Sequence, residues 1–445
     1  MSKPDNPAVP GADFLDLSEL RSIQKRRWRT QAAHVRRHSD FYRALYGAPL
    51  RLTGEIEQLA ELPFTDKEQL RESQRRHPPF GDYLAADPVS IMRMHRTSGT
   101  TGSAMNLALS RSDALMTAAV GGRSQSASGL GPGHRVVHCL NYQLWMGGYT
   151  DHASLEATGA MVIPYGVGNS RGLIEVIREL DVTAISCTPS YPAVLEQTIA
   201  REFPGLNPKD LGLQLGLFGG EPGLDEPAFR RRLEETWGFA ARNSNYGVTD
   251  VLCNFAGQST TDNDLHLVAL DVLYPELIDP GTGQVKNWRE GESGELVLTH
   301  LAKECQPLVR FRTGDIVTLT GTGKARCGRT APRFRVTGRS DDMVVVRGIN
   351  VFPVMIAGVI NQHPVLSGSY RIRLAEPPPY DLLPVEVEIA ESEPGQPAPA
   401  ADIAEDIERD IKRYIGVTAR VEVLPVGSLP RTEGKTRHVI REYRE

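Results

Sequence analysis

Apolar and polar positions follow two different rhythms through the middle of the chain. Residues 182–189 and 213–220 are short apolar runs, which predict buried strands. Residues 172–180 instead show helical spacing, which predicts a helix with one apolar face. That face consists of Leu173, Ile174, Ile177 and Leu180. Strands that alternate with helices need crossover connections, so this region predicts a parallel α/β sheet.

Similar patterns extend the expected α/β region on both sides. Its other elements are a charged helical segment at 17–46, strands at 135–140 and 159–164 with a small-residue helix between them, and a helix with an apolar stripe of Phe229, Leu233 and Trp237. From Leu265 to Leu319 the pattern changes to β segments separated by Gly and Pro turns. This change predicts an antiparallel β subdomain.

After Asp342 the pattern indicates a compact α+β unit. Its expected elements are a strand at 384–390, a helix with Ile403, Ile407 and Ile411 on one face, and a strand at 419–426. The chain has 445 residues, too many for one hydrophobic core. We therefore expect a large N-terminal α/β domain (1–338), a hinge (339–342) and a small α+β C-terminal domain (343–445).

Composition narrows the class of function. Hydrophobic residues make up 40% of the chain, charged residues 24%, and the net charge is −5. Such a chain has no general attraction for nucleic acid or anionic lipid. No apolar run approaches the roughly 18 residues of a membrane span, and the N-terminus lacks the pattern of a secretion signal. The five cysteines include no CxxC pair, which favours reduced thiols and a cytoplasmic location.

One glycine- and hydroxyl-rich segment, RTSGTTGS at 96–103, has the chemistry of a phosphate-binding loop. Glycines let backbone N–H groups approach an anion, and hydroxyls add donors. Its candidate ATP-binding residues are Ser98, Gly99, Thr100, Thr101 and Gly102. The alternative is an ordinary exposed turn.

Two further segments follow expected strands. Gly219, Gly220 and Glu221 end a buried run, and ligands of open α/β sheets bind beyond the carboxyl ends of strands. The second segment runs from Asn243 to Asp250 (NSNYGVTD). Its Tyr246 offers a flat face for a purine, Gly247 a close backbone approach, Thr249 a hydroxyl and Asp250 an oxygen ligand for Mg²⁺. The alternatives are a simple strand-to-helix turn and a buried tyrosine followed by a turn.

Three later segments add candidate polar groups. Asp315 follows an expected strand and could accept both hydroxyls of a ribose. Arg339 and Asp341 lie in the segment GRSDD, whose position suits a hinge. Lys435 lies in the loop LPRTEGKTR, from which a cation could reach an α-phosphate. Solvated turns, a charged linker and a solvated lysine are the alternatives.

Together, the order and spacing of these segments resemble the adenylate-forming superfamily of acyl-CoA synthetases, over about 96–437. The runs 327–353 and 429–437 are similar to phenylacetate–CoA ligases in particular. The resemblance implies that residues 98–103 hold phosphates, Tyr246 stacks on adenine and Asp315 holds the ribose. It also implies that Arg339 contacts nucleotide, Thr249 and Asp250 lie by phosphate and Mg²⁺, Asp341 is the domain pivot, and Lys435 serves adenylation.

The same resemblance implies an ATP- and Mg²⁺-dependent enzyme that activates a carboxylic acid and passes it to CoA. In this branch an aromatic segment before a Gly pair lines the acid pocket. Here the pocket candidates are Tyr142, Trp145, Phe218 and Val248. Aromatic walls favour an aryl or arylacetic acid, although these residues could equally be core aromatics. An amine acceptor and a catalytically silent homologue are the rival functions, and a homodimer is left open.

The sequence departs from the family pattern in three places. Asp250 stands where relatives usually carry Glu, and Gly102–Ser103 stand where many carry Lys and Pro. Some members of the branch also have a cysteine-rich metal site. The candidates for such a site are Cys253, His266, Cys305 and Cys327, but their spacing does not match four zinc ligands.

Overall fold

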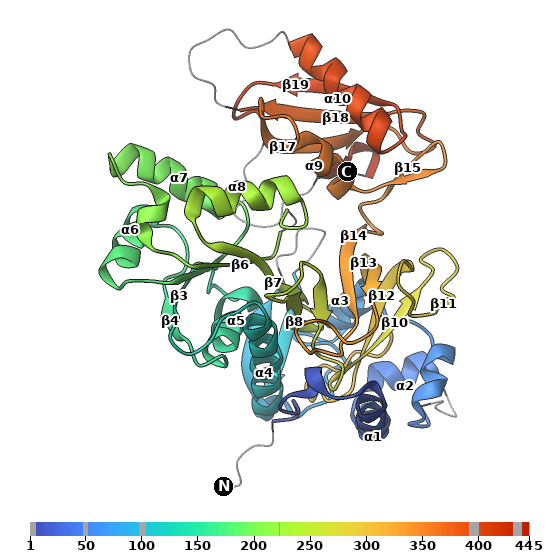
Figure 1. Cartoon of the computed structure of the whole chain (residues 1–445). Coiled ribbons are helices and arrows are strands. Elements are labelled where there is room, and N and C mark those ends of the chain that lie inside the picture. Colours follow the sequence, from blue (N-terminus) through green and yellow to red (C-terminus); the bar gives the residue numbers. More distant parts are fainter. Residues whose placement is uncertain are drawn as a thin grey trace. The chain divides into compact units, whose positions relative to one another are not determined.

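The structure is a computed structural model that describes residues 6–47, 52–97, 104–221, 223–390, 400–429 and 438–444 (Figure 1). The chain divides into two compact units. Unit 1 comprises residues 1–225, 232–313 and 317–335, and unit 2 comprises residues 226–231, 314–316 and 336–445. Because residues 226–231 and 314–316 group with unit 2, the division is not a single cut in the sequence.

A mixed sheet organises unit 1, and two of its strands, β13 and β14, run on into unit 2. Its order is β11-β10-β12-β13-β14-β9-β8-β7-β6-β5-β3-β4. The strands are β3 (Arg135–His138), β4 (Met161–Pro164), β5 (Ala184–Cys187), β6 (Leu215–Gly219), β7 (Ala240–Val248), β8 (Leu252–Gln258), β9 (Leu265–Leu267), β10 (Leu273–Ile278), β11 (Val285–Lys286), β12 (Ser293–His300), β13 (Phe311–Gly321) and β14 (Arg333–Arg339). A separate hairpin pairs β1 (Ile91–Arg96) with β2 (Asn106–Ser110).

The half of the sheet from β4 to β7 is parallel, as the sequence predicts. Every residue of β5 and β6 is buried, which explains their continuous apolar runs. The crossovers are α5 (Met146–Glu156), α6 (Ser170–Glu179), α7 (Tyr191–Glu202) and α8 (Pro227–Trp237), and α4 (Arg111–Ala127) precedes β3. Leu173, Ile174 and Ile177 are buried, but Leu180 is 45% exposed because α6 ends before it.

The antiparallel half begins earlier than the sequence suggests. The change occurs where β8 returns along β7, and β9 and β14 pair antiparallel beyond it. These strands extend the same sheet and do not form a separate β layer. The predicted β segments are therefore present, but the subdomain that they form is continuous with the parallel half.

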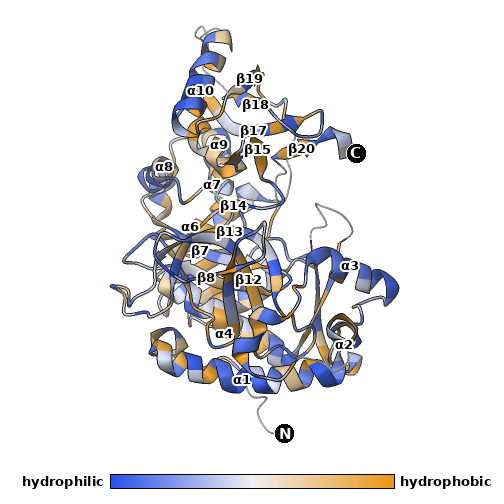
Figure 2. Cartoon of the chain, turned by 90° about the vertical axis from the view of Figure 1, so that its right-hand side faces the viewer, coloured by the Kyte–Doolittle hydropathy of each residue, from blue (hydrophilic) through white to orange (hydrophobic). Residues whose placement is uncertain are grey.

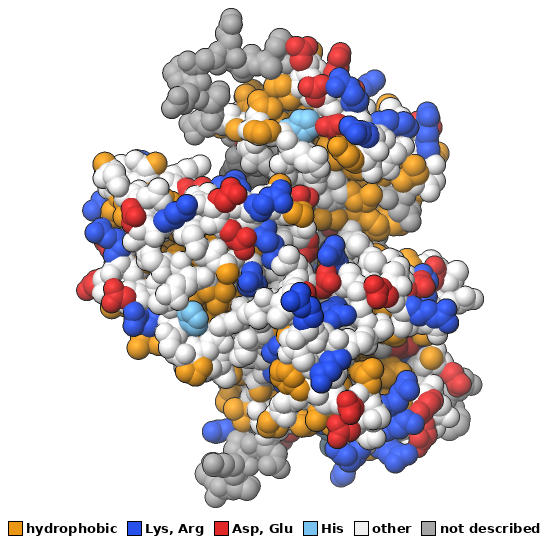
Figure 3. Space-filling view, in the orientation of Figure 1, with side chains coloured by type: hydrophobic (Ala, Val, Ile, Leu, Met, Phe, Trp, Pro, Cys, Tyr) orange, Lys and Arg blue, Asp and Glu red, His pale blue; other side chains and the backbone are white. Residues whose placement is uncertain are grey.

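The N-terminal segment contributes helices to unit 1. They are α1 (Leu17–His38), α2 (Asp40–Tyr46) and α3 (Lys67–Arg76), so the expected helical segment is broken at Ser39. Figure 2 shows both hydrophilic and hydrophobic positions along α1, and its buried apolar residues are Leu20, Trp28, Ala32 and Val35. On the face shown in Figure 3, acidic and basic side chains are interspersed. No helix in the described part of the chain combines the length and hydropathy needed to cross a membrane.

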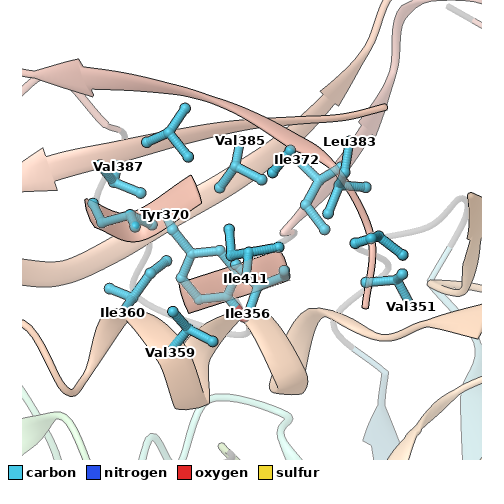
Figure 4. Packing of buried hydrophobic residues seen from close by; sticks show 14 of the residues in the cluster. Val351, Ile356, Val359, Ile360, Tyr370, Ile372, Leu383, Val385, Val387 and Ile411 are labelled. Carbon is cyan, nitrogen blue, oxygen red and sulfur yellow. The ribbon is translucent and has the colours of Figure 1, made fainter. Parts of the chain in front are cut away.

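Unit 2 is the expected α+β domain. Its sheet has the order β19-β18-β17-β20, and a hairpin of two short strands precedes it. The elements are β15 (Val344–Val346), β16 (Ile349–Val351), α9 (Pro353–Ile360), β17 (Leu366–Leu374), β18 (Leu383–Ile389), α10 (Ala400–Tyr414), β19 (Ala419–Leu424) and β20 (Val439–Arg441). Figure 4 shows side chains of both helices meeting those of β17 and β18. Ile403, Ile407 and Ile411 are all buried there, as predicted.

The apolar face of α10 should therefore carry much of the stability of unit 2. Ile407 is fully buried, so Ile407→Ala should lower the free energy of unfolding by about 2–5 kcal/mol. Denaturant unfolding followed by circular dichroism measures this change. Glu405→Ala, on the exposed face of the same helix, is the matched control and should shift stability by no more than about 0.5 kcal/mol. Equal effects of the two substitutions would contradict the assigned core.

Candidate active site

The candidate residues of unit 1 gather at the carboxyl ends of β6 and β7. The two strands are parallel neighbours, and Gly219 pairs with Asn245. A Cβ atom on Gly219 would lie 2.6 Å from the Cβ of Asn245, so only glycine fits there. The chain then turns at Gly220 with φ +83°, which brings Glu221 and Tyr246 to the same edge of the sheet.

Tyr246 is held by aromatic neighbours. Its ring lies edge-on to Phe255 and Phe334, with centroid distances of 5.2 and 5.4 Å, and the residue is half-buried. A side chain on the next residue, Gly247, would overlap the carbonyl oxygen of Cys253 in β8. The hairpin from β7 to β8 therefore requires glycine at this position, and it fixes the tyrosine beside it.

Asp250 lies in the turn after β7 and is 6% exposed. Its Oδ2 atom accepts a hydrogen bond from Lys67 Nζ at 2.9 Å, while its buried Oδ1 atom has no partner among the described residues. A buried acceptor without a partner is unfavourable unless a donor or a cation binds it. Asp250 could thus supply one oxygen ligand to a divalent cation, with Lys67 on its other oxygen.

Lys67 was missed by the sequence analysis. It is the first residue of α3, and 183 positions separate it from Asp250. Lysine at the start of a helix carries no recognisable local signal, so only the fold shows the pair.

Asp315, Arg339 and Asp341 form a continuous chain of charges within unit 2. Arg339 donates from Nη1 to Asp315 at 2.6 Å, and from Nε and Nη2 to the two carboxylate oxygens of Asp341 at 2.8 and 3.0 Å. Burial lowers the pKa of Arg339, but the charges of Asp315 and Asp341 outweigh it and raise that pKa overall. The guanidinium is therefore a permanent cation that orients both acids.

The local structure around Asp315 differs from expectation. The sequence analysis placed Asp315 after a strand, whereas it lies within β13. Gly314 precedes it with φ +76°, so the strand is irregular at this point, and the apparent turn signal is a kink inside the strand. Asp341 lies in the turn between β14 and β15, where the sequence analysis expects the hinge.

The aromatic candidates for the acid pocket are only partly brought together. Trp145 precedes α5, and its Cη2 atom lies 4.0 Å from the position of a Cβ on Gly220. Tyr142 donates or accepts a hydrogen bond with His152 Nδ1 at 2.9 Å. Phe218 is fully buried, and its ring centroid lies 5.8 Å from that of Phe239, an environment of core packing. Val248 is half-buried at the end of β7.

A glycine pair lets the loop before α5 fold back on itself. A side chain on Gly148 would overlap the carbonyl oxygen of Asn141, and a Cβ on Gly147 would lie 2.9 Å from the Trp145 ring. The backbone of this loop and the tryptophan are thus packed directly on the first turn of α5.

The phosphate-loop candidates (98–103) and Lys435 lie outside the described residues. Of the four metal candidates, only His266 and Cys327 lie together, and Asp262 joins them with ligand atoms within 4.8 Å of one another. Cys253 instead bonds to Asp151, and the Cys305 backbone bonds to Asp113. The set that the sequence analysis considered is therefore divided between three places.

A depression of about 430 Å³ lies at the opposite edge of the parallel strands. Arg135, the first residue of β3, and Thr183, just before β5, help to line it. Ligands of α/β sheets bind at the carboxyl ends of strands, so this depression is not the expected nucleotide site.

The chain matches two family models. Residues 47–300 match the AMP-binding enzyme model, and residues 348–442 match the AMP-binding enzyme C-terminal domain. Among curated proteins, it is 36% identical to a phenylacetate–coenzyme A ligase of Pseudomonas putida, covering 98% of this chain and 97% of that one. The corresponding ligase of Thermus thermophilus is 33% identical, covering 97% of this chain and 98% of that one.

A structural comparison agrees with these matches. The fold superposes on 2-hydroxyisobutyryl-CoA ligase in complex with 2-HIB-AMP with a TM-score of 0.86 and 28% identity, covering 99% of this chain and 94% of that one. Family models, curated relatives and fold therefore converge, and the chain belongs to the adenylate-forming AMP-binding enzymes, in their phenylacetate–CoA ligase-like branch.

Proposed function

We propose that this enzyme uses ATP to convert a carboxylic acid into an acyl-adenylate and then transfers the acyl group to CoA. The observation that carries the proposal is the convergence of Gly220, Tyr246 and Asp250 at the ends of β6 and β7, where an α/β sheet binds its ligands. The names of the relatives, phenylacetate–CoA ligases and 2-hydroxyisobutyryl-CoA ligase, support the same two-step chemistry.

In the first step, a carboxylate oxygen attacks the α-phosphorus of ATP, and the bond to the pyrophosphate oxygen breaks. Tyr246 would stack on adenine in the orientation that Phe255 and Phe334 impose. Residues 98–102 and Lys435 would bind phosphate oxygens and balance the charge of the transition state. Asp250 and Thr249 would hold a Mg²⁺ ion, which supplies further charge neutralisation at the phosphates.

Asp315 and Arg339 would define the ribose end of the nucleotide. Arg339 Nη1 already binds one oxygen of Asp315 and so fixes the orientation of the carboxylate. A carboxylate held in this way can accept the two ribose hydroxyls without losing side-chain freedom on binding. The same guanidinium binds Asp341, so the nucleotide contact and the proposed pivot share one cation.

In the second step, the C-terminal domain (343–445) would turn about Asp341 and bring the residues 347–348 to the acyl-adenylate. Arg347 and Gly348 form a tight turn, with φ values of +47° and +81°. Nothing lies within 4 Å of a Cβ on Gly348, which leaves space for a pantetheine arm. The CoA sulfur then attacks the acyl carbon, its proton is lost, and AMP leaves as the bond to phosphate breaks.

An aryl or arylacetic acid remains the proposed substrate class, because Tyr142 and Trp145 flank the loop before α5. An amine acceptor is the alternative second substrate. The amide bond synthetase McbA shares the fold with a TM-score of 0.54, but its 18% identity supports no more than that. The relatives with higher identity are named as CoA ligases, so CoA is the acceptor that the comparisons favour.

A panel of carboxylic acids tests the proposed function directly. Pyrophosphate release should depend on the acid, and AMP and a CoA thioester should accumulate only when CoA is present. Lys435→Ala is the control, and we expect it to reduce adenylation by about 100-fold or more. Acid-dependent pyrophosphate release without any thioester would overturn CoA as the acceptor, and an amine panel would then identify the alternative.

The Asp250 carboxylate is the second test. Asp250→Asn removes the charge that faces Lys67 and weakens the only described carboxylate proposed for Mg²⁺. We expect the Mg²⁺ concentration for half-maximal pyrophosphate release to rise about tenfold, while Asp250→Glu is tolerated. Lys67→Met is the matched control, because it breaks the same ion pair without removing the oxygen ligand. Identical Mg²⁺ titrations for wild type and Asp250→Asn would exclude the metal role.

The proposed pivot gives the third test. Asp341→Pro fixes φ near −65° and should block the second conformation, so pyrophosphate appears in a single turnover but little thioester follows. Asp341→Ala loses the bonds to Arg339 but keeps the backbone free, so it separates the pivot from the ion pair. Full thioester turnover by Asp341→Pro would refute rotation about this residue.

A further inference from the structure

A carboxyl group, an amide and a thiol form a buried cluster next to the proposed acid pocket. Asp151 on α5 accepts a hydrogen bond from Asn245 Nδ2 on β7 at 2.5 Å and from Cys253 Sγ on β8 at 3.0 Å. Asp151 is only 2% exposed, whereas Asn245 is half-buried. The sequence analysis singled out neither Asp151 nor Asn245, and the proposed two-step chemistry uses neither of them.

In the contacts described, every group that donates a hydrogen bond to Asp151 is neutral. Burial therefore raises its pKa to about 7, although the bonds from Cys253 and Asn245 partly oppose this shift. Burial also raises the pKa of the Cys253 thiol, which keeps the thiol protonated and able to donate. In the contacts described, Asp151 accepts both bonds, and these bonds orient the amide and the thiol.

The orientation of Asn245 follows from this arrangement. An amide offers donors at one end and an acceptor at the other. Because Nδ2 donates to Asp151, Oδ1 is the end of the amide that is left to accept a hydrogen bond from another group. Asn245 also packs against Gly219, since a Cβ on Gly219 would lie 2.6 Å from its own Cβ. Asn245 therefore lies between Asp151 and the end of β6, where Gly219 and Gly220 stand.

The end of β6 at Gly219 and Gly220 is adjacent to Trp145, a candidate residue of the acid pocket. Trp145 lies 4.0 Å from the position of a Cβ on Gly220, and its ring packs on Gly147. Gly147 and Asp151 are four residues apart on α5, so they lie on one face of the helix. Trp145, Gly219–Gly220 and Asn245 thus border one region of unit 1, and Asp151 is hydrogen-bonded to Asn245 there.

We infer that Asn245 selects carboxylic acids that carry a neutral hydrogen-bond donor, a hydroxyl or an amino group, and that Asp151 is the positioning residue that fixes the Asn245 amide. This inference rests on the proposed function and narrows its substrate class. A site that offers an acceptor discriminates strongly against an analogue without the donor, because its own polar atom is then left unpaired.

Pairs of acids that differ only by a donor test the inference on the wild-type enzyme. The pairs are 2-hydroxyisobutyrate against pivalate, and the ring isomers of hydroxy- and aminophenylacetate against the methylphenylacetates. We expect kcat/KM for pyrophosphate release to favour at least one donor-bearing acid over its methyl partner by about tenfold or more. The difference should lie mainly in KM, because the contact forms already in the ground state.

Variants assign the preference to the two residues. Asn245→Leu should reverse it, because a methyl group then fits better than a hydroxyl. Asp151→Asn should bring the ratio within each pair to about one, because the amide of Asn245 is no longer held in one orientation. Asp181→Asn, the same change at a side chain that is 87% exposed, is the matched control and should keep the wild-type ratio.

The possible outcomes separate the inference from the proposed function. Pyrophosphate release that prefers the donor-bearing acid in none of the pairs, or an unchanged ratio in Asn245→Leu, would overturn the inference and leave the proposed function intact. A lack of release with every acid would overturn both. If Asp151→Asn does not fold, the half-buried Asn245→Leu variant and the wild-type ratios still decide.

Discussion

The close approach of β6, β7 and β8 is the constraint on which the site of unit 1 depends. Gly219 must pass the side chain of Asn245, and Gly247 must pass the carbonyl oxygen of Cys253. Neither position has space for a side chain, so two glycines allow three strands to converge at one edge of the sheet. Tyr246, Asp250 and Asn245 take their positions from this convergence, and a substitution at either glycine would displace all three.

Unit 2 relies on a different device, a single guanidinium shared by two acids. Arg339 binds one oxygen of Asp315 and both oxygens of Asp341. A planar fork can satisfy two carboxylates in fixed geometry, which a lysine could not. The arrangement joins β13, the end of β14 and the turn that follows it. A movement of that turn would therefore be coupled to the carboxylate proposed to bind ribose.

The sequence predicted best what depends on local patterns. The strands at 184–187 and 215–219 are buried along their whole length, so their apolar runs were sufficient to identify them. Leu180 was misplaced because the pattern does not show where a helix ends. The kink at Gly314 resembled a turn, since a glycine–aspartate pair has the same local signal in both settings.

Contacts between distant residues could not be predicted in this way. The bond from Asn245 to Asp151 spans 94 positions, and that from Cys253 to Asp151 spans 102. Asn245 lies in the motif 243–250 and Cys253 was a metal candidate, but nothing in either local context points to Asp151. Their relation arises only when α5 packs on β7 and β8.

Two buried aspartates in unit 1 show how the partner decides the role of a carboxylate. Asp250 faces Lys67, so it has a cationic partner and keeps one buried oxygen for a further ligand. Asp151 has only neutral donors in the contacts described, and burial raises its pKa to about 7. A charge that is paired with a cation suits phosphate and metal chemistry, while a carboxyl between neutral donors suits the orientation of an amide. The same residue type would therefore serve the proposed nucleotide site at one end of β7 and, through Asn245, the proposed acid site beside it.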